Sequence, residues 1–454
     1  MSVFDPAGQR ADGLRTDLYQ LTMAAAMHHS GLDHRATFEL FTRRLTGERG
    51  FWVAAGLELA LEYLEGLSFS AAQIDYLRGL PGFEAHGDFL DYLAGFRFSG
   101  EVKAVAEGTP VFPWEPLLQV TGPAIEVQLV ETYLLSLINF QTLIASKAAR
   151  IDFASGDKTF VDFGTRRAHG PEAGELVARA SYIAGASGTS NVEAGMRLGI
   201  PVMGTFAHSW VMSFEEEDEA FRRYAEAFPH HTTLLIDTYD TLAAARRIVR
   251  RNMVCQAVRL DSGALGELSK QVRKIFVEGG RPEIKIVASN DLNELKVEAL
   301  EGMGCEIDVY GVGTELATSK DMPALGGVYK VVETKQGDEV RHPIKLAASK
   351  RSWPGAKQVY RFEDHDLICL SSESAAEGGR PLLEAVMSEG QRLRPAPALA
   401  DLRASCLEQV AALPSAVRKL RKPAEYPVKR SEALVALADR AHDAARARGA
   451  GVKS

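Results

Sequence analysis

Residues 159–168 read TFVDFGTRRA, a short apolar run followed by polar and charged residues. The same order recurs about seven times before Leu316, with a helix-length amphipathic segment between successive apolar runs. Each apolar run has the length and composition of a strand that is covered on both faces, as in a parallel sheet. The predicted strands are residues 159–163, 181–186, 201–204, 233–237, 256–260, 284–288 and 307–311. The alternation predicts either a (β/α) barrel or an open doubly wound sheet.

Chemically useful side chains follow most of these predicted strands. In both architectures ligands bind at the carboxyl ends of the strands, so residues placed there are candidates for one common site. The residues at these positions are Arg166, Ser190, His208, Arg259, Asp261, Asn290 and Thr314. We therefore expect the fold to bring them together.

Composition narrows the class of protein. The chain has 454 residues, enough for two or three domains, and a net charge of -8, which gives no global reason to bind nucleic acid or an anionic membrane. The four cysteines are scattered without a CxxC pair, which favours a reducing compartment and no structural zinc site. No leader-like or bilayer-length apolar segment is present, so we expect a cytoplasmic protein.

The segments before and after this array do not follow the regular alternation of strand and helix. Residues 16–27 predict a helix, residues 100–120 predict antiparallel strands, and residues 124–150 predict one long helix. After Leu316 the chain predicts a hairpin around residues 336–338, and a capped helix ends it. We expect an N-terminal part of an α+β domain at 1–150, a βα catalytic domain at 151–325, and C-terminal strands at 326–454 that return to the α+β domain.

The single motifs have both functional and ordinary structural explanations. His208 at a strand mouth could act as a base, a ligand or a phosphoryl acceptor, or could simply bond to a loop carbonyl. Gly311 and Gly313 in GVGTEL could offer backbone N–H groups to a phosphate, although a GxG also occurs in ordinary turns. Arg259 and Asp261 could hold an anion and a ribose diol, or could pair with each other.

The segment DFGTRRA raises a similar choice. Phe163 could cover a planar ligand with Arg166 and Arg167 at its edge, which would suit a heteroaromatic acid. The alternative is a core phenylalanine beside two solvated arginines. The DFG letters also occur in protein kinases, but neither the glycine-rich loop nor the HRD segment of kinases accompanies them here.

Seven motifs in order resemble those of the nicotinate phosphoribosyltransferase family. They are TDLYQLTM, VDFGTRRA, ASGTSN, GTFAHSW, VRLDSG, ASNDLNE and YGVGTEL, and the resemblance covers roughly residues 16–333. The resemblance implies a type II phosphoribosyltransferase: an incomplete (β/α) barrel of about seven parallel strands plus an α+β sandwich-like domain, in a homodimer with sites at the subunit interface. It implies an ATP-hydrolysing ligase of NAD salvage that joins nicotinate to phosphoribosyl pyrophosphate, with Mg²⁺ assisting.

The resemblance also implies roles for individual residues. His208 matches the histidine that ATP phosphorylates transiently, and Tyr19 matches a tyrosine delivered by the partner subunit. We assign to nicotinate the residues Tyr19, Phe163, Arg166, Ser190, Thr205 and Arg259. We assign to the phosphoribosyl group the residues Asp261, Asn290, Gly311, Gly313 and Thr314. No side chain is assigned to a metal.

Ser190 bears on the choice of substrate. Related nicotinamide-using enzymes carry an aspartate at the matching position, which would repel a nicotinate carboxylate, so serine favours the acid. The alternatives are a nicotinamide or quinolinate phosphoribosyltransferase, or a nucleotide-sensing relative without turnover. Schiff-base chemistry is disfavoured, because Lys285 starts its predicted strand instead of ending it.

Overall fold

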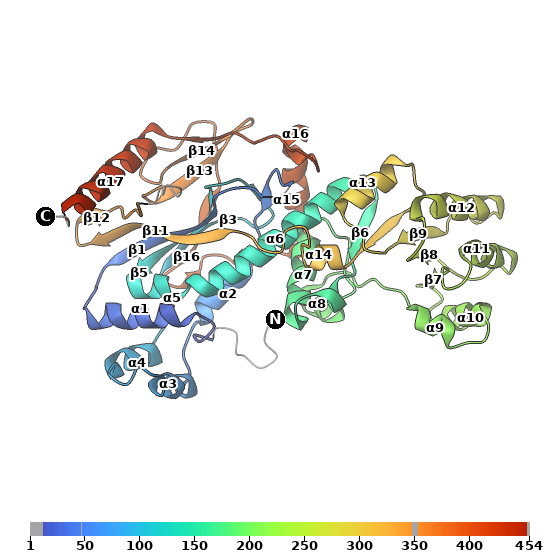
Figure 1. Cartoon of the computed structure of the whole chain (residues 1–454), viewed down its shortest axis with the longest axis horizontal. Coiled ribbons are helices and arrows are strands. Elements are labelled where there is room, and N and C mark those ends of the chain that lie inside the picture. Colours follow the sequence, from blue (N-terminus) through green and yellow to red (C-terminus); the bar gives the residue numbers. More distant parts are fainter. Residues whose placement is uncertain (1–11, 47, 347–352, 452–454) are drawn as a thin grey trace.

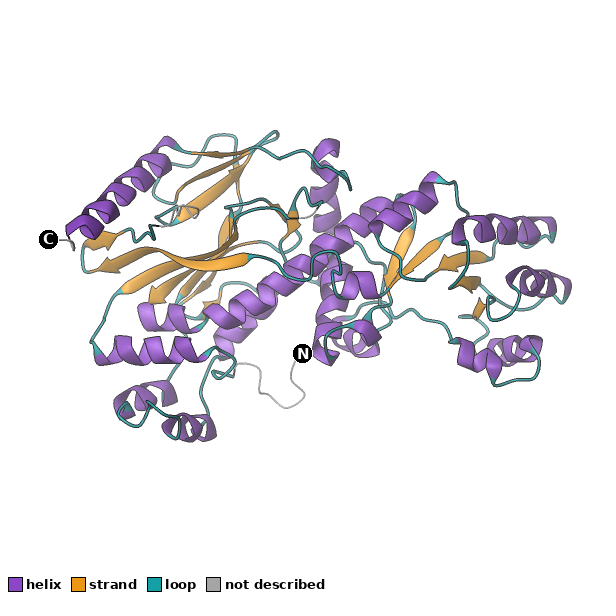
Figure 2. Ribbon diagram, viewed as in Figure 1, coloured by secondary structure: helices purple, strands orange, loops and turns teal. Residues whose placement is uncertain are grey.

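The computed structural model describes residues 12–46, 48–346 and 353–451. The chain forms two bodies, one built on a large antiparallel sheet and the other on a parallel sheet (Figures 1 and 2). Helix α6 (Glu131–Ser155) runs from one body into the other (Figure 1). The domain boundary that we expect at residue 150 therefore falls inside a shared helix.

The parallel sheet has five strands in the order β6-β10-β9-β8-β7. Their apolar side chains, among them Val258, Ile286 and Tyr310, are fully buried, as expected of strands covered on both faces. Every pairing in this sheet is parallel, which confirms the predicted βα array. The strands are β6 (Thr159–Asp162), β7 (Thr233–Leu235), β8 (Ala257–Leu260), β9 (Lys285–Ala288) and β10 (Val309–Val312).

Two of the predicted strands are not strands in the structure. Residues 181–183 form the end of α7, because the buried face that includes Val177 and Ala180 continues to Ile183. Thr189 makes single-residue parallel bridges to Asp162 and to Val202, so the segments around residues 189 and 202 extend the sheet beyond β6 by one bridge each. A side-chain hydrogen bond connects the following segment to β7: the Thr205 hydroxyl donates to the Thr233 carbonyl at 2.9 Å. The incomplete barrel of about seven strands stays a prediction.

Helices connect the strands of the parallel sheet and mostly follow the predicted amphipathic segments. Asp240 and Asn293 cap two of them by accepting the backbone N–H groups of Ala243 at 2.9 Å and Lys296 at 3.0 Å. The helices are η1 (Thr165–Arg167), α7 (Pro171–Ile183), α8 (Val192–Leu198), α9 (His208–Met212), α10 (Glu217–Ala227), α11 (Thr241–Arg250), α12 (Leu265–Glu278), α13 (Glu294–Gly302) and α14 (Thr314–Ala317).

The antiparallel sheet joins the two ends of the chain. Its order is β12-β11-β1-β5-β3-β16-β17, so N-terminal strands pair with C-terminal ones at β1–β11 and at β3–β16. This confirms a second sheet domain built from both ends, and β11 and β12 confirm the predicted hairpin. The strands are β1 (Arg35–Thr42), β3 (Glu101–Val105), β5 (Pro116–Pro123), β11 (Gly327–Gln336), β12 (Glu339–Arg341), β16 (Leu383–Ser388) and β17 (Gln391–Arg392).

Two smaller sheets and eight helices complete the fold. The small sheets are β15-β13-β14-β18 and β2-β4. Their strands are β2 (Trp52–Val53), β4 (Pro110–Val111), β13 (Lys357–Arg361), β14 (Asp366–Leu370), β15 (Arg380–Pro381) and β18 (Val428–Arg430). The helices are α1 (Leu18–His29), α2 (Leu57–Gly66), α3 (Ala71–Arg78), α4 (Gly87–Ala94), α5 (Ala124–Leu129), α15 (Leu399–Ala412), α16 (Ser415–Arg418) and α17 (Glu432–Gly451).

The long helix predicted at residues 124–150 is two helices, α5 and α6, which meet at Val130. Buried ion pairs anchor α6 to the body that contains the parallel sheet: Lys147 contacts Glu294 at 2.6 Å, and Arg150 contacts the same carboxylate at 3.0 Å. The helix thus positions α13, which follows the pocket loop at residues 289–291. Among the residues described, no helix is long and apolar enough to cross a membrane.

Candidate active site

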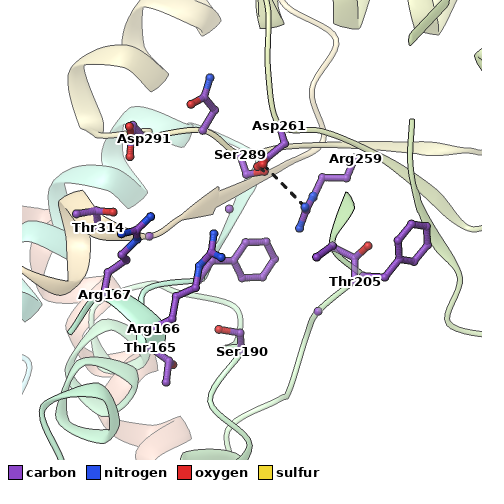
Figure 3. Close-up of a pocket in the computed structure, with 17 residues that line it drawn as sticks. Thr165, Arg166, Arg167, Ser190, Thr205, Arg259, Asp261, Ser289, Asp291 and Thr314 are labelled. Carbon is purple, nitrogen blue, oxygen red and sulfur yellow. Dashed lines mark hydrogen bonds and ion pairs between the residues drawn. The ribbon is translucent and has the colours of Figure 1, made fainter. Parts of the chain in front are cut away.

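A pocket of about 590 Å³ opens at the carboxyl ends of the parallel strands (Figure 3). Residues at or just after the ends of β6, β8, β9 and β10 line it, together with Ser190 and residues 204–207, as expected for a parallel βα sheet. The lining residues are Phe163, Thr165, Arg166, Arg167, Ser190, Gly204, Thr205, Phe206, Ala207, Arg259, Asp261, Ser289, Asn290, Asp291, Gly311, Gly313 and Thr314. The fold therefore brings the predicted site residues together, except for His208, which lies next to the pocket, and Tyr19.

The aromatic ring of Phe163 lies over the backbone of Gly311. A Cβ atom at position 311 would come within 2.5 Å of the ring, so glycine is required for the ring to stay there. The Phe163 N–H donates to the Val312 carbonyl at 2.9 Å, which holds the start of this turn against β10. The result is a half-buried aromatic face on the pocket wall, suited to a planar ligand.

The guanidinium of Arg259 lies in the pocket, and the protein satisfies only part of its hydrogen-bonding capacity. Its side chain is 14% exposed and its Nη2 lies 4.0 Å from Asp261 Oδ2, while its buried Nε has no hydrogen-bond partner among the described residues. Burial lowers the pKa of Arg259; Asp261 and Asp237 oppose that shift, and nearby Arg166 adds to it. The guanidinium groups of Arg166 and Arg259 line the same cavity and can together bind an anion.

His208 begins α9 and contacts two polar side chains from neighbouring loops. Its Nδ1 lies 3.1 Å from Thr238 Oγ1, and its Nε2 lies 3.8 Å from Asp261 Oδ2. In the tautomer whose Nδ1–H donates to Thr238, Nε2 carries the lone pair and faces the Asp261 side of the pocket. The imidazole is also partly exposed, so a ligand in the pocket can reach it.

Sequence reasoning missed Asp237, although it ends the predicted strand at residues 233–237. Its Oδ2 accepts the Asp261 N–H at 2.8 Å and the Ser262 hydroxyl at 2.6 Å, and its buried Oδ1 has no partner in the part of the chain that the structure describes. The Ser289 hydroxyl in turn donates to Asp261 Oδ1. Asp237 thereby fixes the position of Asp261, and the strand-end rule applied to every strand would have found it.

The rim opposite Arg259 contains backbone in an uncommon conformation. Asn290 and Asp291 have φ values of 106° and 45°, in the region that side chains other than glycine rarely occupy. Such strain persists only where the surrounding structure enforces it, and it is often found at binding sites. Arg167, which the sequence places at the edge of a planar ligand, lines the pocket as well. Ser289 and Asp291 also line it and are not among the predicted site residues.

Tyr19 lies away from the pocket of its own chain. It belongs to α1, which packs in the antiparallel body (Figure 1), and its side chain is 47% exposed. Its neighbours Leu18 and Met23 on the same helix are also exposed, at 59% and 38%. A single chain therefore leaves the predicted site without its tyrosine.

The pocket offers little to hold a metal by protein ligands alone. Among the described residues, no group of three or more His, Cys, Asp or Glu side chains is arranged to bind a metal ion. Two carboxylates lie at or beside the pocket, those of Asp261 and Asp237. Oδ1 of Asp237 has no hydrogen-bond partner among the described residues. This fits Mg²⁺, which proteins commonly bind through one or two carboxylates together with substrate phosphates.

Three family models match most of the chain. The nicotinate phosphoribosyltransferase (NAPRTase) N-terminal domain matches residues 14–139, the family model matches residues 158–345, and the C-terminal domain matches residues 375–438. The central match contains the parallel sheet and the whole pocket.

Proteins and structures of known name are similar over nearly the full length. A nicotinate phosphoribosyltransferase of Mycobacterium tuberculosis is 42% identical over 94% of this chain and 93% of its own, and one of Bacillus subtilis is 39% identical over 92% and 93%. The crystal structure of human nicotinic acid phosphoribosyltransferase superposes with a TM-score of 0.82 at 30% identity, covering 94% of this chain and 99% of that one.

Proposed function

The chain belongs to the nicotinate phosphoribosyltransferase family, and from this premise we propose that it joins nicotinate to 5-phosphoribosyl 1-pyrophosphate, giving nicotinate mononucleotide and pyrophosphate in NAD salvage. The observation that carries the proposal is the pairing of an aromatic wall with two guanidiniums in one pocket. Phe163 offers a face to a pyridine ring, and Arg166 and Arg259 offer charge to its carboxylate.

The neighbouring part of the pocket suits the phosphoribosyl group. Asp261 can accept the hydroxyls of a ribose diol, and Thr314 with the bare backbone of Gly311 and Gly313 can hold the 5-phosphate. As pyrophosphate leaves the anomeric carbon, positive charge grows on the ribose, so the protein mainly has to hold the two reactants in line. Mg²⁺ would neutralise the pyrophosphate oxygens, with Asp261 and Asp237 as its protein-side neighbours.

His208 is the residue that we propose couples the reaction to ATP. The Nε2 lone pair attacks the γ-phosphorus of ATP, an N–P bond forms, the bond from this phosphorus to the β–γ bridging oxygen breaks, and ADP leaves with that electron pair. Water later cleaves the N–P bond and releases phosphate. While it is present, the phosphoryl group adds negative charge beside Asp261 and changes how tightly the substrates bind, which makes the enzyme an ATP-hydrolysing ligase.

We further propose a homodimer in which Tyr19 completes the partner's pocket. Beside the pocket, α8 and the next segment expose Val192, Met196 and Val202, at 71%, 69% and 51%. Exposed apolar patches of this kind on α1 and on α8 are typical of surfaces that another chain covers. A two-fold axis would place each α1 on the other chain's α8 face, giving two equal contacts.

The decisive test compares substrates. Purified protein with Mg²⁺, ATP and phosphoribosyl pyrophosphate should convert nicotinate far better than nicotinamide, because Ser190 carries no charge to repel the acid. Equal or reversed preference would contradict the role of Ser190. No product from either substrate would instead support the relative without turnover.

The ATP role has a separate test. We expect His208→Asn to abolish the stimulation by ATP and to leave a slow, uncoupled synthesis, because asparagine cannot form the N–P bond. Radiolabelled γ-phosphate should label the wild-type protein and not the variant. An unchanged ATP dependence in this variant would exclude the phosphohistidine.

A further inference from the structure

The carboxylate of Asp162 lies beneath the pocket, where two of its walls meet. Asp162 ends β6, has no exposed surface, and is not part of the pocket lining. Its Oδ1 accepts the Gly164 N–H at 2.8 Å, and its Oδ2 accepts the Thr189 hydroxyl at 2.7 Å. The first bond holds the turn that carries Phe163, and the second holds the loop that carries Ser190.

Backbone contacts tie the same loop to Asp162. The Ser190 N–H donates to the Asp162 carbonyl at 2.8 Å, and the Asp162 N–H donates to the Gly188 carbonyl at 3.0 Å. Because the one proton of the Thr189 hydroxyl goes to the carboxylate, the Thr189 oxygen is free to accept the Asn191 N–H at 3.0 Å. The carboxylate therefore sets the orientation of the whole 188–191 loop.

Thr189 extends this connection to a third wall. Its N–H donates to the Pro201 carbonyl at 3.0 Å, and its carbonyl accepts the Met203 N–H at 2.9 Å. Two residues later the chain reaches Thr205, which lines the pocket. One buried carboxylate thus links the segments that present Phe163, Ser190 and Thr205.

We propose that Asp162 is a positioning residue that fixes Ser190 against the Phe163 ring and so sets the preference for a pyridine carboxylate over its amide. The inference rests on the proposed function and deepens it. An ionised carboxylate accepts both donors at once, whereas an amide in its place would turn its own N–H groups toward one of them. Burial raises the pKa of Asp162 to about 6, while the bonds from Thr189 and Gly164 lower it, so the carboxylate is ionised at neutral pH.

The test is steady-state kinetics on Asp162→Asn and on Thr189→Val, the milder variant, which keeps the shape and removes the hydroxyl. Losing a hydrogen bond to a charged group should raise KM for nicotinate by roughly ten- to hundredfold. KM for phosphoribosyl pyrophosphate should stay close to that of the wild type. The ratio of kcat/KM for nicotinate to that for nicotinamide should fall. The double variant should be no worse than Asp162→Asn alone, and Thr189→Ser should restore the wild-type values.

Asp152→Asn is the matched control, because burial also raises the pKa of Asp152 to about 6 and this residue on α6 does not line the pocket. It should leave both KM values unchanged. Equal rises in both KM values, additive effects in the double variant, or a change in Tm alone would overturn the positioning role. Wild-type protein that does not use nicotinate would instead defeat the proposed function, and that result is read before any variant is made.

Discussion

Two charged pairs, one in each body, differ in how completely the protein satisfies them. In the antiparallel body, Lys357 Nζ lies 2.7 Å from Glu39 Oε2, and Glu39 Oε1 accepts the Lys357 N–H at 3.0 Å and the Gln119 amide at 2.9 Å. In the pocket, the Arg259 and Asp261 side chains are 4.0 Å apart, and within residues 12–46, 48–346 and 353–451 Arg259 Nε has no hydrogen-bond partner.

The difference separates scaffold from site. Buried polar groups are normally paired within the protein, so a group that is left short of partners needs another explanation, and a ligand is a common one. We therefore expect loss of the first pair to lower stability and loss of the second to weaken binding.

Glu39→Gln should lower the free energy of unfolding by about 3–5 kcal/mol, because it leaves the Lys357 ammonium buried without its counter-charge. Urea unfolding followed by circular dichroism measures the change. Arg35→Ala is the control: its pair with Glu101, also in the antiparallel sheet, is solvent-exposed, and its loss should cost less than about 1 kcal/mol. Comparable losses in the two variants would remove the distinction between them.

Arg259→Ala should act on activity and not on stability. Removing one partner of a desolvated charge contact costs about 2–5 kcal/mol, so kcat/KM for nicotinate should fall by roughly thirty- to several-thousand-fold. Tm should stay the same or rise, since a partly unsatisfied cation is lost. Arg222→Ala on the exposed face of α10 should leave kcat/KM unchanged. A large loss of Tm with an unaffected KM would place Arg259 in the scaffold.

Asp162 is buried as deeply as Glu39 but has no cationic partner among the described residues, so no counter-charge opposes the effect of burial on its pKa. Its folded pKa of about 6 exceeds the ordinary value of 3.8, so the folded protein binds this proton more tightly than the unfolded chain. Its contribution to stability is fully present below about pH 4 and is lost as the pH rises through about 6. The loss amounts to up to about 3 kcal/mol, at 1.36 kcal/mol for each unit by which the folded and unfolded pKa differ.

Urea titrations of wild type and Asp162→Asn between pH 4 and 7 measure this contribution as the difference between the two curves. Taking the difference cancels the carboxylates that the two proteins share. A difference that does not change across this range would show that Asp162 titrates alike in the folded and unfolded states.

Gly311→Ala should disturb the pocket sterically, at a cost of about 1–3 kcal/mol in binding, because its Cβ would come within 2.5 Å of the Phe163 ring. The measurement is KM for nicotinate, which should rise as the ring is displaced. Gly302→Ala at the end of α13 meets no atom within 4 Å and should be neutral or slightly stabilising. Equal effects of the two substitutions would show that the ring tolerates the extra methyl group.

The sequence predicted most of the pocket because strand-end position is a local property. Short apolar runs are visible in the chain, and the residue after each run lies at the ligand face in any parallel βα fold, which is how Arg259, Asp261 and Thr314 were found. The same rule, applied unevenly, missed Asp237. The seven-motif resemblance added the roles, which position alone does not supply.

Other features depend on tertiary contacts that no local pattern reveals. Residues 181–183 looked like the start of a strand, yet the buried face of α7 continues through Ile183. The hydrogen bond between Asp162 and Thr189 joins segments that are 27 residues apart in sequence. The separation of Tyr19 from the pocket follows from the way both chain ends build one sheet.

That shared sheet also affects how the protein is made. Glu39 cannot form its ion pair until Lys357 has been synthesised. Lys357 lies 318 residues later in the chain, and at about 5–20 residues per second the ribosome needs roughly 15–60 s to reach it. For much of that interval β1 and β5 have been synthesised while β11 has not, so an edge of the sheet has no partner. Unpaired edges invite other chains. Nascent chains of this protein should therefore depend on chaperones, and slowing translation should lower the yield of folded protein.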